Sequence, residues 1–282
     1  MDPSNLLKEY INAILDSREE DFQKIQAANE SYDAILGYIS RLDRNPKAFA
    51  RVFQVNDQGF FTGFALGARV RREEHLQLAV FFMDRGLAGI KSKVKAQASR
   101  IRVRPMSTTA AAIKGYQIRI YFDAPEEART SPKAYNKWLA ANLEDLLTND
   151  GTRSSYVHEF THVQDFKRMD PRFLLRRGQQ KQAEKERQQQ AGEKSRDFGA
   201  YANDPLELNA YFFQAMSDVQ TQLRNVKTPE EKRAIIGSSP QEFVDKFMGT
   251  YLKKQVRKNI DSENWKRLAK RAATSWELLI GV

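Results

Sequence analysis

The chain has 282 residues, of which 41% are hydrophobic and 29% are charged, and its net charge is +10. This size suits one substantial core with helical additions. The chain has no cysteine and no run near the roughly 18 apolar residues of a membrane span, which excludes a disulfide framework, cysteine metal ligands and a transmembrane helix.

The charge and the first residues indicate partners and location. A net charge of +10 favours an anionic partner, namely nucleic acid, phospholipid or an acidic protein surface, although excess Lys and Arg also simply keeps a protein soluble. The start Met1–Asn5 has neither the basic segment nor the apolar run of a secretory signal, so we expect no secretion by a signal peptide. The lack of cysteine fits a reducing compartment or a virus particle.

Residues 1–45 are expected to form a helical hairpin. Asp2 can cap a first helix with Pro3 at its first position, and a charged break at Arg18–Asp21 separates it from a second helix. The second helix has apolar residues at helical spacing, namely Phe22, Ile25, Tyr32, Ile35, Ile39 and Leu42. Such a hairpin can pack on the main domain or on another subunit.

The pattern changes toward strands between residues 48 and 122. A turn at Asn56–Gly59 lies between two apolar runs and predicts a β-hairpin. Leu76–Phe82 has the continuous apolar character of a buried strand. Ile101–Arg104 and Tyr116–Phe122 alternate apolar and polar residues, so each predicts a further strand.

Two helices follow these strands. Ser131 as N-cap and Pro132 at the first position begin one helix, and Asn149–Gly151 is predicted to be the turn after it. Ser154 or Ser155 is the expected N-cap of the next helix. Its apolar stripe faces a core and consists of Tyr156, Phe160, Val163 and Phe166. His158, His162 and Asp165 fall on another face of that helix.

This helix contains the pattern His158-Glu159-x-x-His162. Residues four apart lie one above the other on a helix, so both imidazoles can reach one metal ion. Glu159 lies beside such a metal and can take a proton from its bound water, which is the role of a general base. Two surface histidines on a solvated helix are the alternative. A third ligand would have to be a carboxylate or His75, which we expect to be a surface residue.

The segment after this helix is a Gln-rich and charged tract, followed by another helix start. Residues 176–197 have no large apolar residue, so we expect a mobile insertion, either passive or acting as a lid. Asp204 and Pro205 then predict the N-cap and the first position of another helix. This helix is expected to run to about residue 225 and to carry Glu207 in its first turn. Ala210 is small enough to let a second helix approach closely.

The pattern HExxH followed by Glu-x-x-Ala on a later helix resembles the gluzincin branch of the zincin metallopeptidases. It is especially similar to small zincin-like peptidases of tailed phages, in which Pro-x-Glu-x-x-Ala follows the HExxH helix, here Pro205–Ala210. The resemblance covers residues 100–225. It implies zinc held by His158, His162 and Glu207, with Glu159 as base; an ordinary first-turn Glu207 is the alternative.

The chain departs from the gluzincin pattern in one position. An Asp usually follows the ligand Glu by four residues, and here that position is Tyr211; Asp165, Asp204 or Asp218 can take its place beside the metal ligands. The resemblance also implies an oxyanion-binding tyrosine, for which Tyr201 and Tyr211 are candidates, although packing tyrosines are common.

The resemblance further implies an edge strand that pairs with extended substrate, for which Ile101–Arg104 or Tyr116–Phe122 is the candidate. The C-terminal part is expected to be helical. Thr228–Glu231 and Ser239–Glu242 have the residues of capping boxes. The last helix has one apolar stripe, expected to dock on a core, formed by Trp265, Leu268, Ala272, Trp276 and Leu279.

Together these patterns predict an α+β, zincin-like fold with a small mixed or antiparallel sheet on the HExxH helix. The expected parts are a helical hairpin (1–45), a metallopeptidase domain (46–225) and a helical region (226–282). The expected function is zinc-dependent hydrolysis of a protein or peptide substrate, in a host cytoplasm or a virion. The alternatives are a zincin-fold structural or assembly protein, for example in a phage particle with homo- or hetero-assembly contacts, and a nucleic-acid-binding protein.

Overall fold

The computed structural model describes residues 18–42, 45–71, 74–87, 101–105, 115–148, 150–168 and 198–280. The fold is mixed α and β, as predicted, and most of its elements are helices. The described residues form two compact units: the first holds 18–26, 164–168 and 198–280, and the second holds those between 27 and 163. The chain passes from one unit to the other inside two helices, α2 (Arg18–Arg41) and α5 (Asp150–Arg168). The domain boundaries expected from the sequence stay a prediction.

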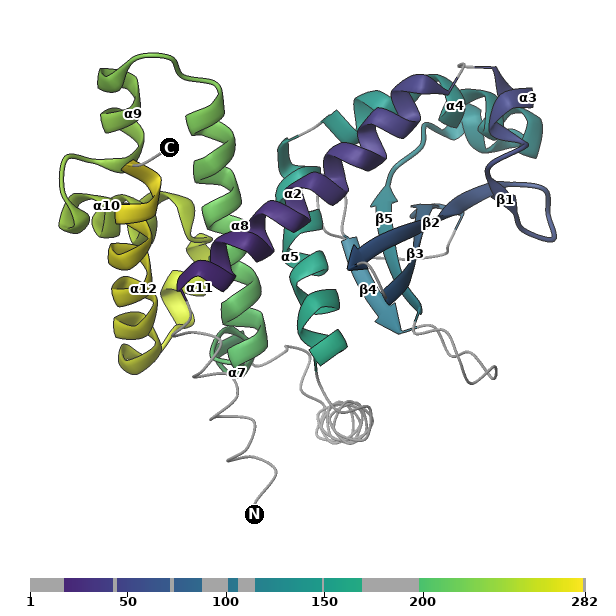
Figure 1. The fold of residues 1–282 in the computed structure, drawn as a ribbon. Helices are drawn as coiled ribbons and strands as arrows, with labels where there is room; N and C mark the ends of the chain where they lie inside the picture. Colours follow the sequence, from purple (N-terminus) through teal and green to yellow (C-terminus); the bar gives the residue numbers. More distant parts are fainter. Residues whose placement is uncertain are drawn as a thin grey trace, which may run out of the picture. The chain divides into compact units, whose positions relative to one another are not determined.

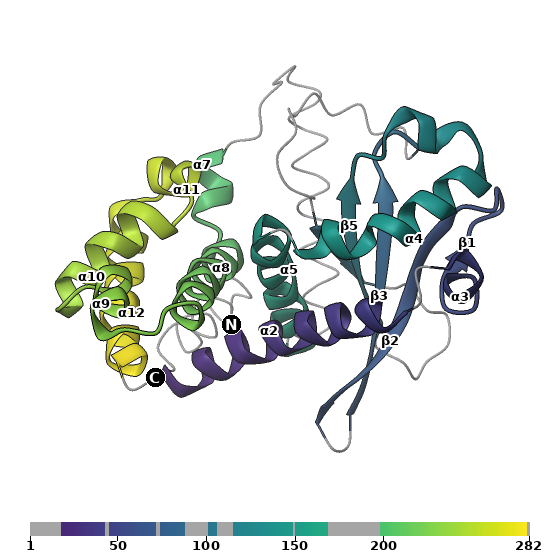
Figure 2. The ribbon, with the colours of Figure 1, turned by 90° about the horizontal axis from the view of Figure 1, so that it is seen from above.

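Helix α2 is one unbroken helix of 24 residues (Figure 2). The predicted charged break at Arg18–Asp21 is wrong, because these residues form its first turn and Asp21 is buried beside Arg271. The predicted first helix of the hairpin falls on residues 2–17, outside the described residues. The apolar face of the second helix is confirmed, with its central members buried: Ile25, Tyr32, Ile35 and Ile39.

The second unit contains a five-stranded sheet in the order β1-β2-β3-β5-β4 (Figure 1). The strands are β1 (Gln54–Val55), β2 (Phe61–Arg71), β3 (Glu74–Asp84), β4 (Ile101–Pro105) and β5 (Gly115–Phe122). Only β3 and β5 are parallel, so the predicted mixed sheet and its strands are confirmed.

The order of the strands decides between the two candidate edge strands. β5 pairs with β3 on one side and β4 on the other, so its backbone is already hydrogen-bonded along both sides. The expectation that Tyr116–Phe122 forms an edge is therefore wrong. Within the described residues β4 lies at the edge of the sheet. This leaves Ile101–Arg104 as the candidate for pairing with an extended partner.

Helix α4 (Pro132–Thr148) packs on this sheet and begins as predicted, since the Ser131 hydroxyl accepts a hydrogen bond from the backbone N–H of Ala134. The ring of Tyr135 lies 6.5 Å from that of Phe122 on β5. Two short helices flank α4, α3 (Pro46–Phe49) and the 3₁₀-helix η1 (Glu126–Thr130). The core of the unit consists of buried side chains from β3, β5 and α4, namely Val80, Phe82, Ile118, Ile120, Leu139 and Leu143.

A buried ion pair closes the end of β3. Asp84, only 3% exposed, accepts hydrogen bonds from Arg129 Nε at 2.7 Å and Arg129 Nη2 at 2.9 Å. It also accepts from the backbone N–H of Ala124 at 2.9 Å and of Leu87 at 3.1 Å. One carboxylate therefore joins the segments that follow β3 and β5 to the last turn of η1.

The first unit is a cluster of helices around α8 (Pro205–Arg224), which has 15 of its 20 residues buried. The other helices of this cluster, which Figure 1 shows beside α8, are α7 (Phe198–Ala202), α9 (Pro229–Ile236), α10 (Pro240–Lys246), the π-helical turn η2 (Phe247–Tyr251), α11 (Lys254–Asn259) and α12 (Ser262–Ile280). In its core the rings of Phe212 and Phe243 each pack at a tilt of 50° against the ring of Phe247. Because α8 is buried on every side, we expect substitutions by larger side chains in it to destabilise the unit.

The predicted helix starts are confirmed in this unit. Thr228 and Glu231 form a complete capping box at α9. At α10 the Ser239 hydroxyl accepts from the N–H of Glu242 as predicted, but the Glu242 carboxylate accepts from the N–H of Ser238 instead of Ser239. The predicted stripe of α12 is confirmed at Leu268, Ala272 and Leu279, which are buried, whereas Trp265 is 37% exposed.

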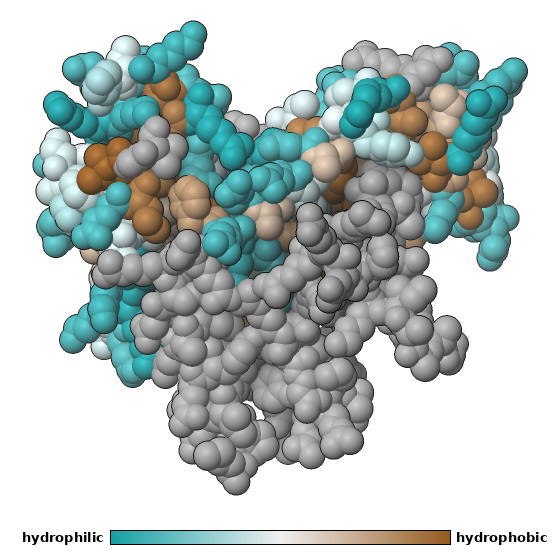
Figure 3. All heavy atoms as spheres, in the orientation of Figure 1, coloured by the Kyte–Doolittle hydropathy of each residue, from teal (hydrophilic) through white to brown (hydrophobic). Residues whose placement is uncertain are grey.

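The surface carries hydrophobic side chains as small patches among hydrophilic ones in the view of Figure 3. The large exposed apolar side chains of the described residues are Val55, Leu87, Trp265, Leu278 and Ile280. In the part of the chain that the structure describes, no helix has both the length and the apolar content that crossing a membrane requires.

Candidate metal centre

Helix α5 carries both histidines of the HExxH pattern on one side. His158 and His162 are each 7% exposed, and their rings lie 5.0 Å apart, nearly perpendicular to each other. The opposite stripe is buried as predicted at Tyr156, Phe160 and Val163, with Tyr156 stacked on Phe160 at 5.7 Å, while the side chain of Phe166 lies outside the described residues. Burial of both faces makes the alternative of a solvated helix with two surface histidines wrong.

The start of α5 differs from the prediction. The helix begins at Asp150, so Ser154 and Ser155 lie inside it and neither is its N-cap. The predicted turn Asn149–Gly151 is likewise wrong at Asp150 and Gly151, which are helical. Glycine is a weak helix former, so local preference favoured a turn here. The buried Ser154 and Tyr156 show that packing of the first turns overrides that preference.

Glu207 comes from the first turn of α8. Asp204 caps this helix, its side chain accepting a hydrogen bond from the N–H of Leu206 at 3.0 Å, and Pro205 occupies the first position as predicted. Glu207 is 8% exposed. The cap and the proline determine where α8 begins, and thereby place the Glu207 carboxylate one turn from the end of the helix.

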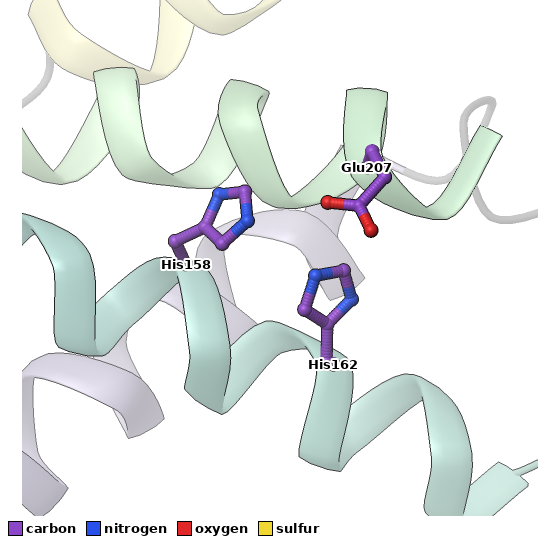
Figure 4. Close-up of side chains that lie close together, drawn as sticks. All are labelled: His158, His162 and Glu207. Carbon is purple, nitrogen blue, oxygen red and sulfur yellow. The ribbon is translucent and has the colours of Figure 1, made fainter. Parts of the chain in front are cut away.

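The side chains of His158, His162 and Glu207 converge (Figure 4). One ligand atom of each lies within 4.8 Å of the other two, and all three residues are buried. Two imidazoles and a carboxylate form a donor set that suits a catalytic zinc site with an open fourth position. Ligands about 2.1 Å from a tetrahedral zinc lie roughly 3.4 Å apart. The separations of the three ligand atoms, all within 4.8 Å, are thus of the order that a shared cation requires.

Both candidate tyrosines lie beside Glu207. Burial raises the pKa of the Tyr201 hydroxyl well above its ordinary value, and the charge of Glu207 together with hydrogen bonds to Glu207 and Tyr211 raises it further. The ring of Tyr211 lies 6.4 Å from that of Tyr201, and the Lys253 ammonium lies 5.5 Å from the Tyr211 ring. Tyr201 is thus a neutral phenol that can donate a hydrogen bond at the centre. Binding of an oxyanion by either tyrosine stays a prediction.

Glu159 follows His158 on α5 and is half-buried. Successive residues of an α-helix are rotated by about 100°, which places Glu159 about 60° from His162 around the helix axis. This position is beside the ligand pair. The general-base role of Glu159 stays a prediction.

Of the three aspartates considered as supports for the ligands, Asp204 caps α8 and Asp218 contributes negative charge near Tyr251. Asp165 is fully buried and accepts a hydrogen bond from the Asn209 amide at 3.0 Å. It is therefore the aspartate that links α5 to α8.

His75, the other candidate ligand, has its backbone in β3 opposite Arg69, and its side chain lies outside the described residues. The Gln-rich tract 176–197 also lies outside them.

Sequence reasoning missed two buried polar residues near the centre, Asn209 and Arg271. A signal for Asn209 existed, since it is a polar residue within the largely apolar segment Leu206–Phe213. The sequence held no such signal for Arg271, because arginine is common on the exposed faces of helices. No family model, curated protein or solved structure matches the chain.

Proposed function

We propose that the protein is a zinc-dependent metallopeptidase. One observation carries this proposal. Three buried side chains from two helices lie close enough together to bind one cation, namely His158, His162 and Glu207. A buried carboxylate and two buried imidazoles are costly to enclose, and a divalent cation compensates that cost. Zinc is the metal that this donor set favours.

The proposed reaction is hydrolysis of a peptide bond. Zinc held by His158, His162 and Glu207 would polarise the carbonyl of the peptide bond and lower the pKa of a bound water. Glu159 would accept a proton from the attacking water as the water oxygen bonds to the carbonyl carbon, and would then pass this proton to the nitrogen as the C–N bond breaks. The products are a carboxylic acid and an amine, so no other reactant is needed. The Tyr201 phenol supports the centre by hydrogen-bonding to Glu207.

The arrangement of the second unit supports the same proposal. Among the described residues β4 is an edge strand, and its neighbour β5 is antiparallel to it. An extended peptide can add to such an edge through backbone hydrogen bonds. We therefore propose a protein or peptide substrate and a zincin-like fold, with β4 as the strand that holds the substrate.

The zinc content of natively purified protein tests the proposed centre. We expect one zinc per chain by elemental analysis, lost in Glu207→Ala because a ligand is removed, and retained in Glu159→Ala because Glu159 is not a ligand. Absence of zinc from the wild-type protein, even after zinc is added back, would sink the peptidase proposal. Loss of zinc in both variants would contradict the assigned role of Glu159.

A further inference from the structure

A chain of buried polar side chains runs through the first unit beside the candidate metal centre. Arg271 on α12 donates from Nε to Asp21 on α2 at 2.6 Å and from Nη1 to the Asn209 Oδ1 at 2.9 Å. Asn209 on α8 in turn donates from Nδ2 to Asp165 on α5 at 3.0 Å. Four helices that are distant in sequence are thus joined by three consecutive hydrogen bonds.

The Arg271 guanidinium is held in one position. It lies 3.9 Å from the centre of the Phe212 ring and 4.8 Å from that of Phe213, and the residue is only 6% exposed. A planar guanidinium that stacks on aromatic rings and bonds a carboxylate at the same time has little freedom to move. It can therefore act as a fixed reference point for the side chain it bonds.

The charges of this region balance. Asp21 and Asp165 are buried together with Arg271 and Lys24, and none of the four is more than 6% exposed. Burial raises the pKa of Asp21 and lowers that of Lys24, and in each case the neighbouring opposite charges oppose the change. Two acids and two bases leave no net charge when all are ionised, so removal of Arg271 leaves an uncompensated buried negative charge.

Arg271 determines how the Asn209 amide is oriented. Because the oxygen of that amide accepts from Arg271, its nitrogen must face Asp165. Asp165 lies three residues after His162 in α5, and Asn209 lies two residues after Glu207 in α8. The Asn209–Asp165 hydrogen bond therefore joins the two helices within about one turn of a predicted ligand on each.

The position of Asn209 around the axis of α8 explains how this hydrogen bond can affect the direction of Glu207. At about 100° per residue, Glu207 and Asn209 lie about 160° apart around the helix, with Leu206 and Ala210 between them. Both intervening residues are buried, and Ala210 is small enough for close approach of a helix, as the sequence predicted. Glu207 and Asn209 therefore lie on either side of this buried strip.

We propose that Arg271 and Asn209 are positioning residues for the metal centre: they fix the rotation of α8 about its axis and so keep Glu207 directed toward His158 and His162. The inference rests on the proposed zinc site. It assigns to the C-terminal helix α12 a part in metal binding, although α12 supplies no ligand.

The zinc affinity of Arg271→Met tests this proposal. We expect zinc to bind about 10- to 100-fold more weakly than in the wild-type chain, because residues that support metal ligands typically contribute that much. The measurement is competition with a chromophoric zinc chelator. Arg129→Met is the matched control, since it also strips a guanidinium from a buried aspartate, Asp84, but in the second unit. It should lose stability and keep the wild-type zinc affinity.

Variants of Asp165 separate positioning from charge. Asp165→Asn retains an oxygen that can accept from Asn209 but loses the negative charge, so it should bind zinc more tightly than Asp165→Leu. Asp165→Leu removes the acceptor and should bind zinc as weakly as Arg271→Met. If Arg271→Met does not fold, Asn209→Ser provides the same test, because a serine hydroxyl is too short to reach both partners.

The outcomes are distinct. Wild-type affinity in Arg271→Met or Asn209→Ser, with tight zinc binding in the unaltered chain, overturns the positioning role and leaves the metal centre standing. Equal weakening in Arg129→Met overturns it too, because the effect would then follow stability alone. An unaltered chain that binds no zinc overturns the proposed function, and this inference with it.

Discussion

Replacement of Glu159 by Gln is expected to lower peptide hydrolysis by about 10²- to 10⁴-fold, the usual contribution of a positioned general base. Gln has nearly the same shape as Glu but cannot accept the proton of the attacking water. Zinc content should be unchanged, since the predicted ligands are His158, His162 and Glu207. The measurement is cleavage of a peptide mixture that covers all residue pairs at the cleaved bond, followed by mass spectrometry.

Glu263→Gln is the control for this experiment. Glu263 lies on α12 with its side chain 74% exposed, paired with Arg267, so the same chemical change there should leave hydrolysis unaltered. Undiminished cleavage by Glu159→Gln would assign the reaction to another group. A wild-type protein that holds one zinc per chain and cleaves no peptide would instead favour the structural or assembly role.

Asp84→Ala is expected to lower the free energy of unfolding by about 3 kcal/mol, which is the low end for breaking a buried ion pair. The low end applies because the Arg129 side chain is 28% exposed, although the Asp84 side chain is fully buried. The variant leaves a guanidinium and the backbone N–H groups of Ala124 and Leu87 without their carboxylate. Urea unfolding followed by circular dichroism measures the change.

A surface ion pair supplies the control. Asp123, whose side chain is 52% exposed, pairs with Arg85 in the same unit, and Asp123→Ala should cost about 1 kcal/mol or less. An equal cost for the two substitutions would contradict the importance given to burial of Asp84.

The same carboxylate predicts a dependence of stability on pH. Burial alone would raise the pKa of Asp84, but hydrogen bonds from Arg129 and from the backbone of Ala124 and Leu87 outweigh it and lower that pKa below its ordinary value. A lowered pKa in the folded state means that the stabilisation is fully present above about pH 4 and is lost as the pH falls through the folded-state pKa. Asp84→Ala should lack this component of acid destabilisation.

Local signals in the sequence were sufficient for most helices and strands. Asp204 with Pro205, and Thr228 with Glu231, satisfy backbone N–H groups within four residues of themselves, so the starts of α8 and α9 could be predicted without knowledge of the fold. The strands of the second unit were likewise visible as apolar or alternating runs. The start of α5 could not be predicted from local signals, because burial of Ser154 and Tyr156 outweighs the preference of Gly151 for a turn.

The sequence by itself determined the helical spacing of His158 and His162, because residues four apart meet on any α-helix. Glu207 was predicted through resemblance, and only the tertiary structure brought its carboxylate to within 4.8 Å of both imidazoles. The tertiary structure alone also decided that β4 is the edge strand within the part of the chain that is described, and that Arg271 lies buried against Asp21 and Asn209. Such pairings join residues far apart in the chain, and the burial that makes them strong exists only once the helices have packed.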